Sequence, residues 1–164
     1  MEKMLLNRLN GEMKKINEGL PQGVVSLAPV EGENGPNLMK WRGAIEGPVG
    51  SSYEGGLFNL DIIIPDDYPL SPPKVTMLTK IYHPNISSSG YICISILKRR
   101  SDDGQWVSGT TLPMLMVALQ SLLSDPNPDD PVVASIASQM KNKPDEYKRY
   151  ATAWTKRYAI KRTM

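Results

Sequence analysis

Between residues 24 and 78 the chain alternates short apolar runs with clusters of glycine, proline, asparagine and aspartate. The runs cover residues 24–30, 38–45, 57–64 and 74–78. In the third run Phe58, Leu60 and Ile62 stand at every second position, which is the period of a strand with one face on a core. Short turns join antiparallel neighbours, so the pattern predicts a four-stranded antiparallel β-meander.

A helical period precedes this region. Apolar residues recur three or four positions apart, and charged residues occupy the other faces, until Gly19 and Pro21 end the pattern. The apolar positions are Leu5, Leu9, Met13 and Ile16, and the charged ones are Arg8, Glu12, Lys14 and Lys15. The segment is therefore expected to form an amphipathic N-terminal helix.

Three more helices are expected after residue 110. Residues 111–123 are apolar on nearly every face, which predicts a buried central helix with Pro113 in its first turn. Asp130 and Pro131 are typical of the N-cap and first turn of a helix over residues 132–140. A last helix begins at Pro144 and carries one stripe made of Tyr147, Tyr150, Ala151, Trp154 and Tyr158.

The order of helix, sheet, loop and helices is that of an α+β fold. With 164 residues, 40% of them hydrophobic, residues 1–164 suit a single domain with its own core. A net charge of +2 and scattered basic residues argue against a nucleic-acid partner. The sequence also has no signal peptide and no apolar run near the ~20 residues that span a bilayer, so we expect an intracellular protein without a membrane partner.

The single cysteine, Cys93, lies in a long irregular segment over residues 81–109, where a functional loop is expected. One thiol forms no internal disulfide, so its value lies in packing or in nucleophilic chemistry. A dyad with the only histidine, His83, is one option, although Pro84 favours a structural imidazole bonded to nearby main chain. One cysteine and one histidine fall short of the usual four zinc ligands, so no metal is expected. Simple burial is the default for a free cysteine without further context.

Several motifs at consistent spacing supply that context, because together they resemble the ubiquitin-conjugating enzymes over about residues 8–158. The motifs are Trp41, Gly47-Pro48, Tyr53-Glu54-Gly55-Gly56, Pro65-Asp66-Asp67-Tyr68-Pro69, Ser71-Pro72-Pro73-Lys74, Tyr82-His83-Pro84-Asn85-Ile86, Ile92-Cys93-Ile94, Trp106 and Ser124-Asp125-Pro126-Asn127-Pro128-Asp129-Asp130-Pro131. The resemblance implies the α+β catalytic core of that family, in which the active-site loop lies between the meander and the central helix.

The resemblance also implies roles for particular residues. Cys93 is expected to receive a modifier as a thioester from an activating enzyme and to pass it to a substrate lysine. Asn85 matches the residue whose amide stabilises the developing oxyanion or braces the loop. Asp130 matches an acidic gate residue that orients the lysine, a role compatible with that of an N-cap. The active-site motif further includes His83, Pro84, Ser95 and Trp106.

Partner contacts are implied on two surfaces. The N-terminal helix would meet the activating enzyme and a ubiquitin ligase, and the ligase would also use two loops; the residues concerned are Arg8, Lys14, Lys15, Pro69, Leu70 and Ser108. A solvated charged helix face explains the three basic residues equally well. Leu70 stands where the family often has a larger aromatic residue, and Ser108 where many ubiquitin-specific members have proline. No cofactor is expected, since ATP is used by the activating enzyme.

The identity of the modifier is predicted from mixed features. Ser95 replaces an aspartate common in compact members, and the segment of residues 98–105 is longer than theirs. Both features recur in long-loop ubiquitin carriers and in carriers of SUMO or of a Nedd-type modifier. We predict ubiquitin, with SUMO or a Nedd-type modifier as the alternative. A non-catalytic ubiquitin-binding variant is the third hypothesis, against which Cys93 and Asn85 argue together. The cytoplasm, the nucleus or both are the expected location.

Overall fold

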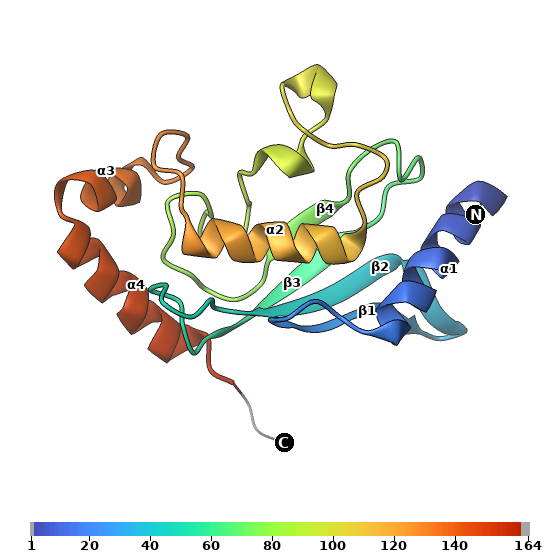
Figure 1. Cartoon of the computed structure of the whole chain (residues 1–164), viewed down its shortest axis with the longest axis horizontal. Helices are drawn as coiled ribbons and strands as arrows, with labels where there is room; N and C mark the ends of the chain where they lie inside the picture. The colour runs from blue at the N-terminus through green and yellow to red at the C-terminus, as the bar shows by residue number, and fades with distance from the viewer. Residues whose placement is uncertain (1, 162–164) are drawn as a thin grey trace.

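The computed structural model describes residues 2–161 of the chain (Figure 1). Helix α1 precedes the four strands, two short 3-10 helices follow them, and three α-helices complete the fold. The bounds are α1 Lys3–Glu18, β1 Val24–Gly32, β2 Gly35–Glu46, β3 Leu57–Ile63, β4 Lys74–Met77, η1 Ser95–Leu97, η2 Arg100–Asp102, α2 Leu112–Ser124, α3 Ala134–Asn142 and α4 Pro144–Tyr158. The predicted α+β order is confirmed.

The four strands form one antiparallel sheet in the order β1-β2-β3-β4, as the apolar runs predicted. Trp41 of β2 stands opposite Ile62 of β3, and Leu60 of β3 stands opposite Met77 of β4. These four side chains are buried, together with Phe58. The alternation seen in the sequence of β3 therefore marks the face of the sheet that lies on the core.

Helix α2 contacts β1 and β2 and crosses the sheet in Figure 1. It begins at the N-cap Thr111, whose side chain accepts a hydrogen bond from the Met114 amide at 3.3 Å. The expectation that α2 is buried on nearly every face is too broad, because Met114 and Val117 are 56% and 40% exposed. One side of α2 therefore packs on the core, and the side with Met114 and Val117 is exposed to solvent.

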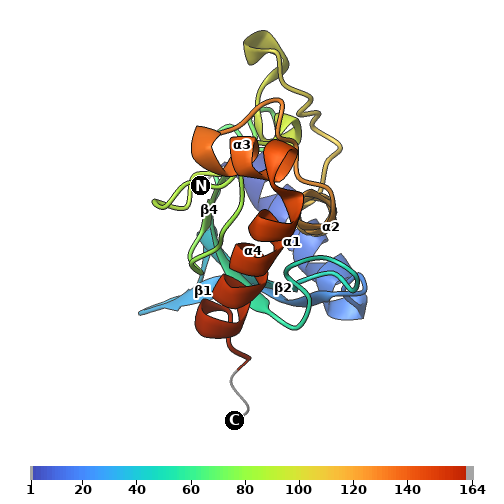
Figure 2. The same cartoon turned by 90° about the vertical axis from the view of Figure 1, so that its left-hand side faces the viewer.

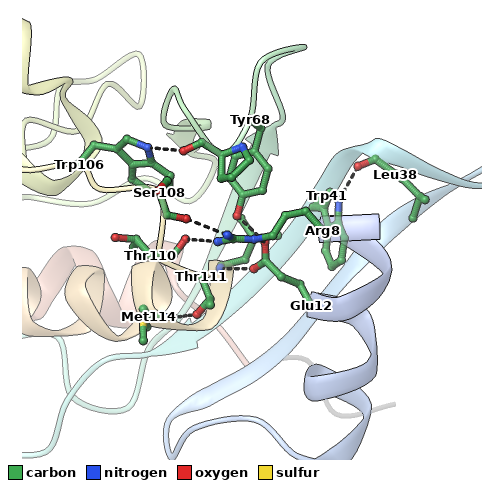
Figure 3. A network of polar contacts seen from close by, with 12 residues as sticks. Arg8, Glu12, Leu38, Trp41, Tyr68, Trp106, Ser108, Thr110, Thr111 and Met114 are labelled. Carbon is green, nitrogen blue, oxygen red and sulfur yellow. Dashed lines mark hydrogen bonds and ion pairs between the residues drawn. The ribbon is translucent and has the colours of Figure 1, made fainter. Parts of the chain in front are cut away.

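The prediction for α1 is wrong at one position, because Glu12 is buried and does not lie on the solvated face. Its Oε1 accepts a hydrogen bond from the Leu112 amide at 2.6 Å, and its Oε2 accepts from Arg8 Nε at 3.1 Å and from the Tyr68 hydroxyl (Figure 3). These donors offset the cost of desolvating a carboxylate. Glu12 thus joins α1 to the start of α2 and to the Tyr68 loop.

Arg8 extends the same network toward the loop before α2. Its guanidinium donates to the carbonyl oxygens of Ser108 at 2.7 Å and Thr110 at 2.8 Å (Figure 3). It also lies over the Tyr68 ring, 5.4 Å from the centroid. The helix and the two loops expected to contact partners are therefore fastened to one another.

The predicted start of α3 is also wrong. The helix begins at Ala134 after Val133, and no side chain caps it, so Asp130 is not an N-cap. The amides of Val132 and Val133 instead donate to the Pro84 carbonyl oxygen at 2.8 and 3.0 Å. Because this segment is bonded to the His83–Asn85 turn, the helix starts only after it, and the Asp130 carboxylate caps no helix.

Helices α3 and α4 lie at the end of the molecule opposite α1 (Figure 1), and Figure 2 views the molecule from their side. The predicted stripe of α4 is divided: Tyr147 and Ala151 are buried, whereas Tyr150 is 46% exposed. Tyr150 and Trp154 lie beside Tyr82, with ring centroids 5.7 and 5.4 Å from that of Tyr82. Among residues 2–161 no helix is both long enough and apolar enough to cross a bilayer.

Candidate active site

His83 is fully buried beneath the turn that it begins. The Asn85 amide donates to Nδ1 at 3.0 Å, so Nε2 carries the proton and donates to the Leu122 carbonyl oxygen at 2.9 Å. Burial lowers the pKa of His83 to about 4, because desolvation disfavours the charged ring. Both ring nitrogens are engaged away from Cys93, so the structure contains no cysteine-histidine dyad. The structural role of His83 follows from these bonds.

Asn85 braces the segment over residues 127–130. Its Nδ2 donates to the carbonyl oxygens of Asn127 at 2.8 Å and Asp130 at 3.0 Å, and its Oδ1 accepts from the Asn127 amide at 2.8 Å. The Asn85 carbonyl oxygen accepts from the Cys93 amide at 2.9 Å. Asn85 therefore connects the part of the loop that carries Cys93 with the segment that carries Asp130. Both amide hydrogens are used in this arrangement, so a direct bond to an oxyanion requires one of them to be released.

The Cys93 thiol is free and half-buried, so it is not sealed in the core. Its Sγ lies 3.6 Å from Asp130 Oδ2 and 3.5 Å from Lys98 Nζ. Asp130 is exposed, and its carboxylate reaches the sulfur from the segment that Asn85 braces. A carboxylate and an ammonium thus both contact the only thiol of the chain. The geometry brings the three predicted catalytic residues together.

Lys98 is the site residue that the sequence analysis missed, since it appeared there only within the long, charged segment. Its backbone is fixed on both sides, by the bond from its amide to the Ser95 carbonyl at 3.1 Å and by the bond from the Trp106 amide to its own carbonyl at 3.0 Å. At Gly104 a Cβ atom would lie 2.0 Å from the Lys98 carbonyl oxygen, so only glycine allows this closure. The only sign in the sequence that Lys98 belongs to the site is its position five residues after Cys93.

The other two motif residues act away from the sulfur. Ser95 is exposed, and its hydroxyl donates to Gln105 Oε1 at 3.1 Å, which joins the two ends of the long loop. Trp106 is buried, and its Nε1 donates to the Pro69 carbonyl oxygen at 2.9 Å. Trp106 thereby holds the Pro69 and Ser108 loops together.

The predicted partner-contact residues differ in their exposure and in the hydrogen bonds that they already make. Lys14, Lys15 and Ser108 are exposed, and Leu70 is 75% exposed. The guanidinium of Arg8 is already bonded to the Ser108 and Thr110 carbonyls, so Arg8 braces this surface. The partner contacts themselves stay predictions.

A groove of about 400 Å³ lies between β4 and the loop segments on either side of Cys93, which is not itself among the residues that line it. Lys74, Ser89, Tyr91, Leu97 and Lys98 are among the residues that line it. Across residues 2–161 no group of three or more histidine, cysteine, aspartate or glutamate residues is placed to hold a metal ion. The groove therefore presents two lysines and several hydroxyl groups, of which Lys98 also contacts the Cys93 sulfur.

The fold and this cysteine-bearing loop define a class of α+β domain with a free thiol at the edge of an active-site-like loop. A family model described as ubiquitin-conjugating enzyme matches residues 8–155. The solved structure of the E2 domain of a ubiquitin conjugating enzyme from Toxoplasma gondii is 41% identical, with a TM-score of 0.81 over 94% of this chain and 98% of that chain. The chain belongs to the ubiquitin-conjugating enzyme family.

We expect the buried imidazole to make stability depend on pH. Because the pKa of His83 is about 4 in the folded state and 6.5 in its ordinary state, the unfolded chain takes up a proton that the folded chain refuses between these values. The free energy of unfolding should therefore fall as the pH drops below 6.5, by at most about 1.4 kcal/mol per pH unit. Above pH ~5 carboxylates contribute little, so urea titrations there isolate the only histidine.

The low pKa of His83 can also be measured directly by NMR spectroscopy. The carbon-bound imidazole protons should keep the chemical shifts of the neutral ring until the pH approaches 4. In His83→Gln the slope of stability against pH in this window should disappear. A titration midpoint near 6.5 in the folded protein would contradict the assignment.

Proposed function

We propose that this chain carries ubiquitin as a thioester on Cys93 and transfers it to a lysine amine or to a ligase. The observation that carries the proposal is the half-buried thiol in contact with Asp130, on a loop braced by Asn85. Membership of the family supports ubiquitin conjugation in general, and the solved relative from Toxoplasma gondii is itself described as a ubiquitin conjugating enzyme. The remaining partners are an activating enzyme that consumes ATP, a ubiquitin ligase and protein substrates.

Charging would proceed by thioester exchange. The Cys93 thiolate attacks the carbonyl carbon of ubiquitin held on the activating enzyme, a new carbon–sulfur bond forms, and the thiolate of that enzyme leaves. The sulfur must be reached by a second protein, which agrees with its place on an open loop. A reduced thiol is needed throughout, so we place this activity in the cytoplasm or the nucleus, where thiols stay reduced.

Transfer to lysine requires an unprotonated amine, whose ordinary pKa is about 10.4. The Asp130 carboxylate, 3.6 Å from Sγ, lies where it would bind the incoming ammonium and direct the amine to the carbonyl carbon. Asn85 would keep Asp130 in this position through the bond to the Asp130 carbonyl oxygen. Direct stabilisation of the oxyanion would use an Nδ2 hydrogen released from Asn127 or Asp130.

A charging reaction tests the proposal. We expect ubiquitin, activating enzyme and ATP to give a single adduct that disappears when a thiol reductant is added, since a thioester exchanges with free thiols. Cys93→Ala should form no such adduct, whereas Ser101→Ala, at the exposed tip of the same loop, should charge as the wild type does.

Parallel reactions with SUMO and a Nedd-type modifier, each with its own activating enzyme, identify the modifier. An adduct with one of these alone would overturn ubiquitin as the modifier. The absence of every reductant-sensitive adduct would contradict the carrier function and leave a non-catalytic binding role.

The role of Asp130 is tested by discharge of the charged protein. In Asp130→Asn the rate of transfer to free lysine should fall by about tenfold or more, because the carboxylate no longer binds and deprotonates the amine. Transfer to a small thiol should change far less, since a thiol needs no such help. The matched control is Asp129→Asn, whose carboxylate is exposed and pairs with Lys141 at 2.7 Å. Equal lysine discharge by both variants would remove Asp130 from the mechanism.

A further inference from the structure

Ser101 lies at the tip of the long loop that follows Cys93. It belongs to the one-turn helix η2, it is exposed, and three basic residues, Lys98, Arg99 and Arg100, directly precede it. This turn, yellow in Figure 1, projects away from the sheet beyond η1. Ser101 is the only serine or threonine of the sequence with three basic residues directly before it. An exposed hydroxyl behind a run of cations suits a protein kinase whose peptide-binding cleft is acidic.

The turn around Ser101 can open without disturbing the core. It is held by backbone bonds of 2.8 to 3.2 Å from the three amides after Ser101 to the carbonyl oxygens of Arg99 and Arg100. A short 3-10 turn has poor hydrogen-bond geometry, and exposed segments open first. The base of the loop stays closed, because the Trp106 amide is bonded to the Lys98 carbonyl at 3.0 Å. A kinase can therefore bind the tip as an extended segment while the base remains folded.

One ion pair joins the tip to a neighbouring loop. Arg99 lies 3.8 Å from Asp67, and both side chains are more than half exposed. Exposed pairs of this kind add little to stability. The pair therefore does not restrain the tip when a kinase binds it.

The third basic residue before Ser101 points to the active site. Lys98 Nζ lies 3.5 Å from Cys93 Sγ, and Asp130 Oδ2 lies 3.6 Å from the same sulfur. A substrate lysine that approaches a thioester on Cys93 would bring a second ammonium to this place. Like charges repel at such distances, so the Lys98 ammonium opposes the binding of the substrate ammonium at Asp130.

We propose that Ser101 is a phosphorylation site, and that its phosphate draws the Lys98 ammonium away from Cys93 and so admits a substrate lysine. This inference rests on the carrier function proposed above. In the modification the Ser101 hydroxyl oxygen attacks the γ-phosphorus of ATP bound to the kinase. An oxygen–phosphorus bond forms, the bond from that phosphorus to the oxygen of ADP breaks, and the hydroxyl proton is released.

A phosphate at Ser101 reverses the sign of the charge on the tip. Residues 98–103 hold three cations and two carboxylates, and a phosphoserine adds about 1.5 to 2 negative charges. Lys98 is three residues away, so at most about 10 Å of chain separates the two Cα atoms, a distance that the two side chains span together. Phosphoryl oxygens accept charge-assisted hydrogen bonds, and three of them can serve Lys98 and Arg100 at once. The phosphate is therefore a stronger partner for the Lys98 ammonium than the sulfur is.

The first test measures the modification without ubiquitin. The purified protein is treated with ATP and cyclic-AMP-dependent protein kinase, a kinase that binds basic residues ahead of the serine. We expect one phosphate, placed on Ser101 by mass spectrometry of peptides, and none on this peptide in Ser101→Ala. In Arg99→Ala/Arg100→Ala the rate should fall by about tenfold, because the cations that the kinase binds are missing.

The matched control is Lys14→Ala/Lys15→Ala, which removes two adjacent exposed cations from α1. Its rate of phosphorylation should equal that of the wild type. Phosphate on another residue alone, or an unchanged rate in Arg99→Ala/Arg100→Ala, would overturn Ser101 as the site.

The second test measures the charge beside the sulfur, again without ubiquitin. Cys93 is treated with a neutral and with a cationic methanethiosulfonate, and the ratio of the two rate constants reports how readily a cation reaches it. Phosphorylation should raise the ratio of cationic to neutral reagent by about threefold or more, and salt should reduce the gain. Unphosphorylated Lys98→Gln should also show a raised ratio, because the ammonium is gone. An unchanged ratio in the fully phosphorylated protein would overturn the movement of Lys98.

The third test uses the protein charged with ubiquitin. Phosphorylation should speed transfer to free lysine by about threefold or more and should change transfer to a neutral small thiol far less. Kinase-treated Ser101→Ala should show no gain. If charging fails while the methanethiosulfonate ratio rises, the phosphate acts on Cys93 as proposed and the carrier function is wrong. If charging succeeds and phosphorylation leaves transfer to lysine unchanged or slower, the inference is wrong and the carrier function stands.

Discussion

The site depends on a neutral histidine that is bonded on both sides inside the protein. His83 donates to the Leu122 carbonyl of α2 and accepts from the Asn85 amide, so it fixes the turn to the central helix. The Pro84 carbonyl then binds the amides of Val132 and Val133, and the Asn85 side chain binds the segment that carries Asp130. Three successive residues thereby fasten the cysteine loop, the central helix and the start of the C-terminal helices to one another.

The Cys93 thiol lies at the edge of this bonded base. The Cys93 amide donates a hydrogen bond to the Asn85 carbonyl oxygen. The Cys93 sulfur contacts the carboxylate of Asp130 and the ammonium of Lys98. The two contacting groups carry opposite charges, a carboxylate and an ammonium. The same pair suits an amine acceptor, because the carboxylate binds an ammonium next to the sulfur. In this structure the ammonium already present is that of Lys98.

A second polar network fastens the other end of the molecule. Glu12 is buried and joins α1 to the Leu112 amide and to Tyr68, and Arg8 holds the carbonyls of Ser108 and Thr110 (Figure 3). The surfaces proposed for the activating enzyme and the ligase are thus parts of one bonded unit. A partner that moves α1 would act on the loop of Trp106, and the Trp106 amide is bonded to Lys98.

Local periodicity predicted the elements well, and long-range bonds account for the errors. The alternation of Phe58, Leu60 and Ile62 defined β3 because one face of the sheet is buried. Glu12 was misplaced because helical spacing assigns a charge to solvent unless distant donors such as Leu112 and Tyr68 are known. Asp130 was misread as a cap because the bonds from the following amides to Pro84 cross some fifty residues of sequence.

Cys93, Asn85 and Asp130 were predicted as catalytic residues only because motifs resembled a known family; the structure places them together, and their catalytic roles stay predictions. Lys98 lay outside those motifs, and its contact with the sulfur depends on the closure of the long loop at Gly104 and Trp106. No local pattern encodes that closure.

The carrier function requires a Cys93 sulfur that is accessible in the folded state, and alkylation measures this accessibility. The chain has one cysteine, so intact mass spectrometry after treatment with iodoacetamide reports this thiol alone. We expect complete addition of one carbamidomethyl group under native conditions, with circular dichroism unchanged. A thiol that reacts only after denaturant unfolds the chain would contradict it.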